Sequence, residues 1–129
     1  MVKDKTISER VIHCAYKVAN GLGSGFLESV YENALCIELS RRGIEYRRQA
    51  SVEVIYRQQM VGHFIADLIV ENKLLVELKA VSAFNQQHSA QVMNYLRATE
   101  LQVGLLINFG PSKIGIKRIV WQYDETEII

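Results

Sequence analysis

Asp67, Glu77 and Lys79 are the residues whose types and spacing best suit chemistry in this sequence. All three interrupt apolar runs, at 61–70 and 74–81, that predict buried β-strands, where charge is costly. Two carboxylates supply oxygen ligands for a hard divalent cation. A neighbouring lysine can hold an attacking water or offset a developing negative charge. The residues therefore predict a divalent metal site with an ammonium group beside it.

The loop at 71–73 sets how these side chains meet, because its composition predicts a tight hairpin. If the loop has three residues, pairing is symmetric about its centre and Asp67 faces Glu77. Their Cβ atoms would lie roughly 5 Å apart, where like charges repel unless a cation lies between them. Glu77 and Lys79 are two residues apart and share one face of the strand expected at 74–81, while Leu78 points to the opposite face.

A structural alternative explains the same charges without a metal. Asp67 and Lys79 would form a buried ion pair, and Glu77 would reach solvent from the end of its strand. The local pattern weighs against this interpretation, because residues 64–70 are apolar on both faces, as expected of a central strand. Three charges clustered where this strand meets its neighbour favour a functional site.

Composition indicates one domain over residues 1–129. The chain is 49% hydrophobic, its mean hydropathy is +0.03 and its net charge is +1, so nucleic acid would have to bind a local basic patch. No apolar stretch approaches the ~20 residues of a membrane span, and no signal-peptide pattern is present, so a cytoplasmic location is expected. Cys14 and Cys36 occupy helical patterns and are expected to be buried thiols.

The order of elements predicts an α/β fold, α-α-β-β-β-α-β-β. Helices are expected at 7–19, 26–42 and 84–99, and strands at 44–56, 61–70, 74–81, 103–109 and 114–121. The second helix is expected to turn Leu27, Val30, Tyr31, Ala34 and Leu35 inward. The glycine-rich turn at 21–25 lacks the preceding strand and the following Gly-Lys of a phosphate-binding loop.

Two helices carry side chains that bear on the site. Gln91 and Tyr95 are four residues apart on one helix face, and His88 lies on the same side, so these side chains can reach a common site. Glu28 lies in the first turn of the second helix and could complete a metal site as a third carboxylate. The alternatives are a polar helix edge for Gln91 and Tyr95, a surface histidine for His88, and compensation of the helix dipole for Glu28.

Asp67, Glu77-x-Lys79 and then Gln91-x-x-x-Tyr95 on a helix resemble the PD-(D/E)XK nuclease superfamily, particularly its RecB-like branch. Gly25-Phe-Leu-Glu28-Ser-Val-Tyr31 resembles the signature of the bacterial GxxExxY proteins, and the likeness covers about residues 7–121. Ala66 stands where that superfamily has a proline before the aspartate. The resemblance implies a restriction-endonuclease-like core, a mixed β-sheet flanked by helices.

The resemblance also implies a hydrolase: a nuclease that uses Mg²⁺ or Mn²⁺ to cleave phosphodiester bonds. Asp67, Glu77, Glu28 and the backbone carbonyl of Leu78 would bind the metal, and Lys79 would orient the nucleophilic water. Substrate contacts would come from Gln91, Tyr95 and Tyr31. The expected partner is nucleic acid, DNA by the base rate of the superfamily, with no membrane and with a homodimer left open. The alternative is a nuclease-fold module with weak or no catalysis that binds nucleic acid or a protein.

Overall fold

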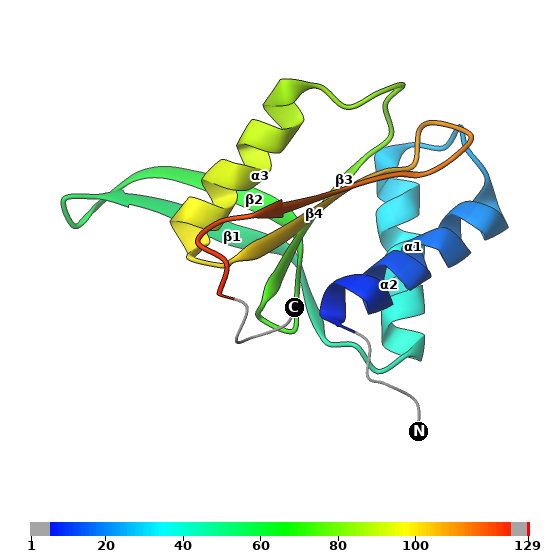
Figure 1. Cartoon of the computed structure of the whole chain (residues 1–129), viewed down its shortest axis with the longest axis horizontal. Helices are drawn as coiled ribbons and strands as arrows, with labels where there is room; N and C mark the ends of the chain where they lie inside the picture. Colours follow the sequence, from blue (N-terminus) through cyan, green and yellow to red (C-terminus); the bar gives the residue numbers. More distant parts are fainter. Residues whose placement is uncertain (1–5, 125–128) are drawn as a thin grey trace.

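A computed structural model of the chain describes residues 6–124 and 129, and it shows three helices and a five-stranded sheet in the expected order (Figure 1). The elements are α1 (Ile7–Leu22), α2 (Glu28–Arg41), β1 (Tyr46–Tyr56), β2 (Gln59–Val70), β3 (Leu74–Lys79), α3 (Gln86–Thr99), β4 (Val103–Asn108) and β5 (Gly115–Val120). Most boundaries lie within two or three residues of those expected from the sequence.

The sheet has the strand order β1-β2-β3-β4-β5 and is mixed. Pairing is antiparallel between β1 and β2, β2 and β3, and β4 and β5, whereas β3 and β4 run parallel. A parallel pair needs a crossover, and α3 provides it. The hairpin register follows the expectation of a three-residue loop, because Val70 pairs with Leu74 and Leu68 with Val76.

Helices cover both faces of the sheet (Figure 1). The larger buried cluster joins α1 and α2 to alternate residues of the central strands, including Leu68, Val76, Leu78 and Leu105. The smaller cluster joins α3 to residues on the opposite face, such as Leu75 and Leu106. Cys14 and Cys36 are free thiols, both buried, as expected. Within the described part of the chain, no helix is both long and apolar enough to cross a membrane.

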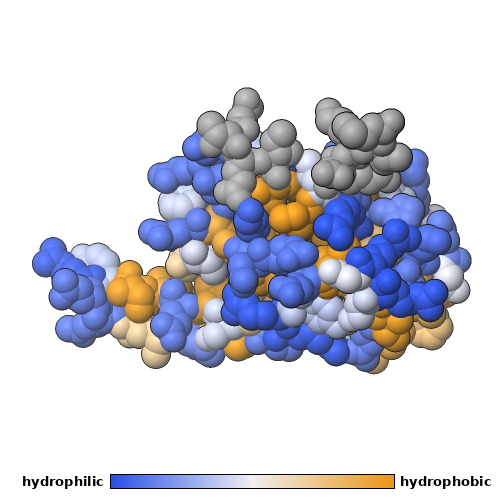
Figure 2. All heavy atoms as spheres, turned by 90° about the horizontal axis from the view of Figure 1, so that it is seen from below, coloured by the Kyte–Doolittle hydropathy of each residue, from blue (hydrophilic) through white to orange (hydrophobic). Residues whose placement is uncertain are grey.

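Two expectations about burial are wrong. Leu27 caps the start of α2 and is 77% exposed, so it does not point inward. Phe64 and Ile65 are also exposed, because this half of β2 leaves the sheet with β1 as a projecting two-stranded arm (Figure 1). Seen from below, the arm carries apolar side chains behind a polar tip (Figure 2). The strand is therefore central only from Ala66 to Val70.

The segment that follows β3 is fixed by Asn108, at the end of β4. Its amide is 1% exposed, accepts hydrogen bonds from the N–H groups of Val81 and Gly110, and donates one to the Val81 carbonyl. Phe109 adds a bond from its N–H to the carbonyl of Lys79. A Cβ at Gly110 would collide with the backbone of Val81, so only glycine fits this approach. These contacts hold the chain immediately after Lys79.

Asn108→Ala should lower the free energy of unfolding by roughly 2–4 kcal/mol, because it leaves buried backbone groups of Val81 and Gly110 without partners. Urea denaturation measures the change. Asn94→Ala is the matched control, since this exposed side chain only accepts a 3.4 Å hydrogen bond from Arg97, and its stability should stay near that of the wild type. Equal losses in the two variants would contradict this account of the Asn108 contacts.

Candidate active site

Asp67 and Glu77 meet where β2 and β3 stop pairing. The Oδ2 atom of Asp67 accepts a 2.7 Å hydrogen bond from the N–H of Leu78, and Oε1 of Glu77 accepts a 3.2 Å bond from the N–H of Asp67. Each carboxylate is thus tied to the backbone of the opposite strand. The two carboxylates lie together, as the hairpin register led us to expect.

The strand pairing is interrupted on both sides of Asp67. Pairing of β2 with β3 extends only to Leu68 and Val76, one position short of Asp67. Between β1 and β2, Arg48 pairs with Leu68 and Ala50 with Ala66, but position 49 has no partner at Asp67. Side-chain hydrogen bonds replace the backbone ladder at this point and leave a gap in the strand pairing.

Both carboxyl groups resist ionisation. Burial, followed by the negative charge of Asp67, raises the pKa of Glu77 to about 9. Burial also raises the pKa of Asp67, although the hydrogen bond from Leu78 opposes this shift. Two acidic groups held together in this way repel each other when both are charged. A cation bound between them would remove that penalty.

Lys79 and Leu78 lie as expected on opposite sides of β3. Leu78 is fully buried in the cluster under α1 and α2. Lys79 is partly exposed, and its positive charge opposes the upward pKa shifts that burial causes in Asp67 and Glu77. Among residues 6–124 and 129, no ion pair joins Lys79 to Asp67. The buried ion pair considered as an alternative is therefore not formed.

Glu28 begins α2 and lies within electrostatic range of the pair. Burial, then the charge of Asp67, raises the pKa of Glu28, while Lys79 lowers it. In the part of the chain that the structure describes, no three His, Cys, Asp or Glu side chains gather closely enough to hold a metal ion. Glu28 is thus near the pair but does not join it as a third close ligand.

Gln91 and Tyr95 form one unit on α3, and Nε2 of Gln91 donates a 3.1 Å hydrogen bond to the Tyr95 hydroxyl. Tyr95 is 6% exposed, and burial, followed by the charge of Glu77, raises its pKa. This pair borders the carboxylates from the α3 layer. His88 does not join it, since its Nδ1 accepts from the N–H of Asn85 and caps the helix.

Tyr31 does not fit the expected role in substrate binding. The side chain is fully buried, and its ring stacks on Phe109 with the centroids 4.7 Å apart. Its hydroxyl donates to the carbonyl of Gly23 and accepts from the N–H of Phe26. A ring with no exposed surface and a fully used hydroxyl offers nothing to a substrate. Tyr31 instead fixes the turn before α2.

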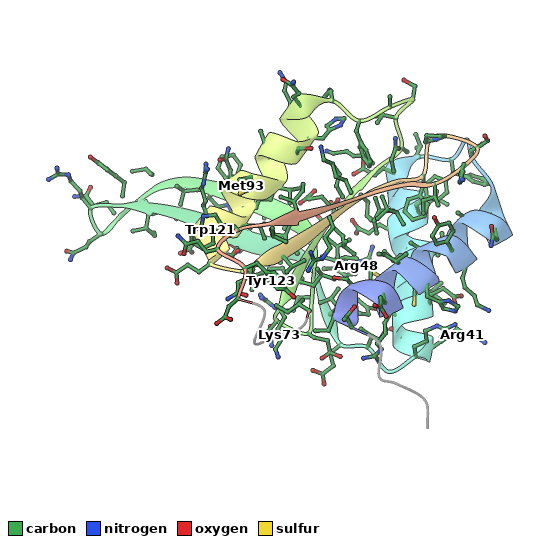
Figure 3. The ribbon with its side chains drawn as sticks, viewed as in Figure 1. Arg41, Arg48, Lys73, Met93, Trp121 and Tyr123 are labelled. Atoms are coloured by element: carbon green, nitrogen blue, oxygen red, sulfur yellow. The ribbon has the colours of Figure 1, made fainter. Side chains whose placement is uncertain are left out.

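Sequence reasoning missed a second polar cluster beside Asp67. Glu32 is only 7% exposed, and its two carboxylate oxygens accept hydrogen bonds from Nη2 of Arg48 (2.8 Å) and Nε2 of Gln49 (2.9 Å). Figure 3 labels Arg48 at the boundary between the sheet and the α1–α2 pair. The only signal in the sequence was Arg48 itself, which breaks the alternation of its strand.

The metal-free protein should lose stability as pH rises. The folded-state pKa of Glu77, about 9, exceeds the ordinary 4.5, so between these values the folded chain binds a proton that the unfolded chain has released. The raised pKa values of Asp67 and Glu28 act in the same direction. Urea denaturation in EDTA at several pH values from 5 to 9 measures this fall. In Glu77→Gln it should be much smaller, and a wild-type stability that increases across this range would refute the assignment.

Comparisons with known proteins agree with this architecture. Residues 5–119 match the family described as PD-(D/E)XK nuclease superfamily. Among solved structures, the crystal structure of SSO0001 has a similar fold, with a TM-score of 0.59 and 19% sequence identity over 98% of this chain and 73% of that one. No curated protein matches. The family match spans most of the sequence, and the chain therefore belongs to the PD-(D/E)XK nuclease superfamily.

Proposed function

We propose that this protein is a nuclease that hydrolyses phosphodiester bonds, with DNA as the expected substrate, and that Asp67, Glu77 and Lys79 form its active site. The observation that carries the proposal is the carboxylate pair in the gap between β2 and β3. A scaffold gains nothing from two facing carboxylates whose pKa values burial raises. Membership of a nuclease superfamily supports the same function.

The donor set fits a hard divalent cation. Asp67 and Glu77 supply carboxylate oxygens, which suit Mg²⁺ or Mn²⁺, and the carbonyl of Leu78 is a further candidate ligand. Glu28 would act directly or through a bound water, in keeping with its position near Asp67 rather than in contact with it. When bound, the metal would activate water and stabilise negative charge on the phosphate.

The residues of the chain would divide the remaining work. The Leu78 N–H fixes Oδ2 of Asp67, so this carboxylate is oriented before any substrate arrives. Lys79 is partly exposed beside the pair, where its ammonium can orient the attacking water and offset the charge that develops on the phosphate. Gln91 and Tyr95 would contact the nucleic-acid backbone, and their mutual hydrogen bond holds both side chains at the border of the site.

A second candidate function is binding without efficient catalysis, and the projecting arm favours it. Ile55, Tyr56, Met60 and Val61 on this arm are each more than half exposed, which is unusual for apolar side chains grouped on a monomer. A groove of about 710 Å³ runs between the arm and α3 and includes Phe64, whose ring contacts Tyr95. Such a surface suits a nucleic acid or a protein partner.

Asp67→Asn separates a catalytic role from a structural one. We expect the variant to lose cleavage of single-stranded and double-stranded DNA and of RNA in Mg²⁺ or Mn²⁺, because it removes a proposed ligand. Its metal-free stability should hold or rise, since the cost of burying the Asp67 carboxylate and its contribution to the raised pKa of Glu77 are both removed, while the amide oxygen can still accept from Leu78. Nuclease assays and urea denaturation in EDTA measure the two effects.

The structural alternative predicts a different result for this variant. The ion pair with Lys79 that the sequence left open is absent from the described residues. A purely structural role of Asp67 would therefore rest on its hydrogen bond from Leu78, and weakening that bond would cost about 1–2 kcal/mol of stability. Such a loss, or full cleavage activity in the variant, would count against the proposed site. A wild-type protein that binds DNA but shows no cleavage in any of these assays would favour the binding function.

Glu28→Gln should weaken Mn²⁺ binding by roughly tenfold or more while leaving the fold intact, as expected for a group that supports a metal directly or through water. Isothermal titration with Mn²⁺ measures the dissociation constant. Glu38→Gln makes the same change on the same helix and should bind Mn²⁺ like the wild type. Unchanged affinity in Glu28→Gln would assign Glu28 to compensation of the helix dipole.

A further inference from the structure

We propose that Glu32, Arg48 and Gln49 form a clamp that positions Asp67 by interrupting strand β1 opposite it. These residues do not reach the proposed substrate; they act through the backbone of the sheet. The inference rests on the proposed function for its catalytic consequence, but its structural part concerns the metal-free protein alone. Four observations support it: side-chain direction, backbone conformation, strand pairing and the saturation of Glu32.

Arg48 and Gln49 are neighbours in β1, and neighbouring side chains of a regular strand point to opposite faces. Here both reach the same carboxylate, at 2.8 Å and 2.9 Å from the two oxygens of Glu32. Arg48 also donates a 2.6 Å bond to Oδ1 of Asn33. The strand cannot be regular at this point, because two consecutive side chains converge on α2.

The backbone of Gln49 shows how this convergence arises. Its φ is +48°, in the left-handed region that a residue with a side chain rarely occupies. This conformation is strained and persists only when surrounding contacts hold it. The hydrogen bond from Gln49 to the buried Glu32 is such a contact.

The irregularity falls opposite the candidate active site. By the register of the neighbouring pairs, Gln49 lies across from Asp67, and both positions are missing from the β1–β2 ladder. Asp67 uses its N–H to hold Glu77, and its carboxylate accepts from Leu78. The kink in β1 therefore coincides with the point where β2 exchanges backbone pairing for side-chain bonds to β3.

Glu32 itself is committed to the clamp. Both of its oxygens accept hydrogen bonds and its charge is paired with Arg48, which disfavours Glu32 as a metal ligand. It lies one turn after Glu28 on α2, and its charge is close enough to contribute to the upward pKa shift of Asp67, after burial as the main cause. The ion pair with Arg48 offsets that charge, so the clamp also limits repulsion at the carboxylate pair.

Two substitutions at Gln49 test the backbone requirement. Gln49→Val strongly disfavours a positive φ, whereas Gln49→Gly accepts it without strain. In Gln49→Val we expect the Leu78 amide, which is bonded to Asp67, to exchange with solvent at least tenfold faster in metal-free protein, and Mn²⁺ to bind at least tenfold more weakly. In Gln49→Gly both quantities should stay within about threefold of wild type, because glycine adopts the positive φ without the bond to Glu32, and Arg48 still joins β1 to that carboxylate. Hydrogen exchange followed by NMR and titration with Mn²⁺ provide these measurements.

Glu53→Val is the matched control for Gln49→Val. It also introduces valine into β1, but at an exposed position that pairs normally with His63. It should leave Leu78 exchange and Mn²⁺ affinity unchanged. Glu32→Ala removes the anchor and should behave like Gln49→Val. Arg48→Ala, at an exposed position, gives a second test if Glu32→Ala fails to fold. Urea denaturation shows whether faster exchange of the Leu78 amide comes from local opening or from a loss of global stability.

The outcomes separate the clamp from the proposed function. If Gln49→Val leaves the Leu78 amide as protected as in the wild type, or if the Gly and Val variants lose protection equally, the clamp is refuted. If the amide responds as expected but the wild type neither binds Mn²⁺ nor cleaves nucleic acid, the clamp stands and the nuclease proposal fails. Loss of cleavage in Gln49→Val, with Gln49→Gly active, supports both.

Discussion

The constraint on which the rest of this structure depends is the confinement of two carboxyl groups in a gap of the sheet. Asp67 and Glu77 repel each other when ionised, and burial deprives them of the water that would screen them. Their position is nevertheless over-determined, by backbone hydrogen bonds across the gap and by helices on both faces of the sheet. The fold therefore maintains an unfavourable local arrangement with stability gained elsewhere, as functional sites commonly require.

Protons and metal ions compete for this pair. A carboxyl group with a pKa of about 9 carries its proton at neutral pH, and a metal ion can bind its oxygens fully only after displacing it. Metal binding would then release protons and tighten as pH rises. Without metal, the retained proton reduces the repulsion between Glu77 and Asp67. The same burial that makes the site costly to form thus keeps one of its two carboxyl groups uncharged until a cation arrives.

Much of the fold could be predicted from the sequence, because short-range patterns set it. The loop at 71–73 fixed the register that brings Asp67 opposite Glu77, and helical spacing placed Gln91 beside Tyr95. Long-range packing was not accessible in this way. Nothing local distinguishes a strand that stays in the sheet from one that leaves it as an arm, so the exposure of Phe64 was missed. The bonds to Glu32 span 16 and 17 residues and depend on one backbone angle, which no periodicity encodes.

The seven-residue segment from Gly25 to Tyr31 contains one residue that fixes the fold, Tyr31, and one acidic residue near the candidate site, Glu28. Tyr31 packs on Phe109 and ties its hydroxyl to the turn at Gly23 and Phe26, whereas Glu28, one helical turn earlier, lies within electrostatic range of Asp67. Tyr31 thus fixes the turn before α2, and with it the position from which the Glu28 side chain extends. Under the proposed function, a protein that retained the tyrosine but lost the glutamate would keep the architecture and lose a group that supports the metal. Tyr31 on its own is therefore a marker of shape, and the proposed activity calls for Glu28 as well.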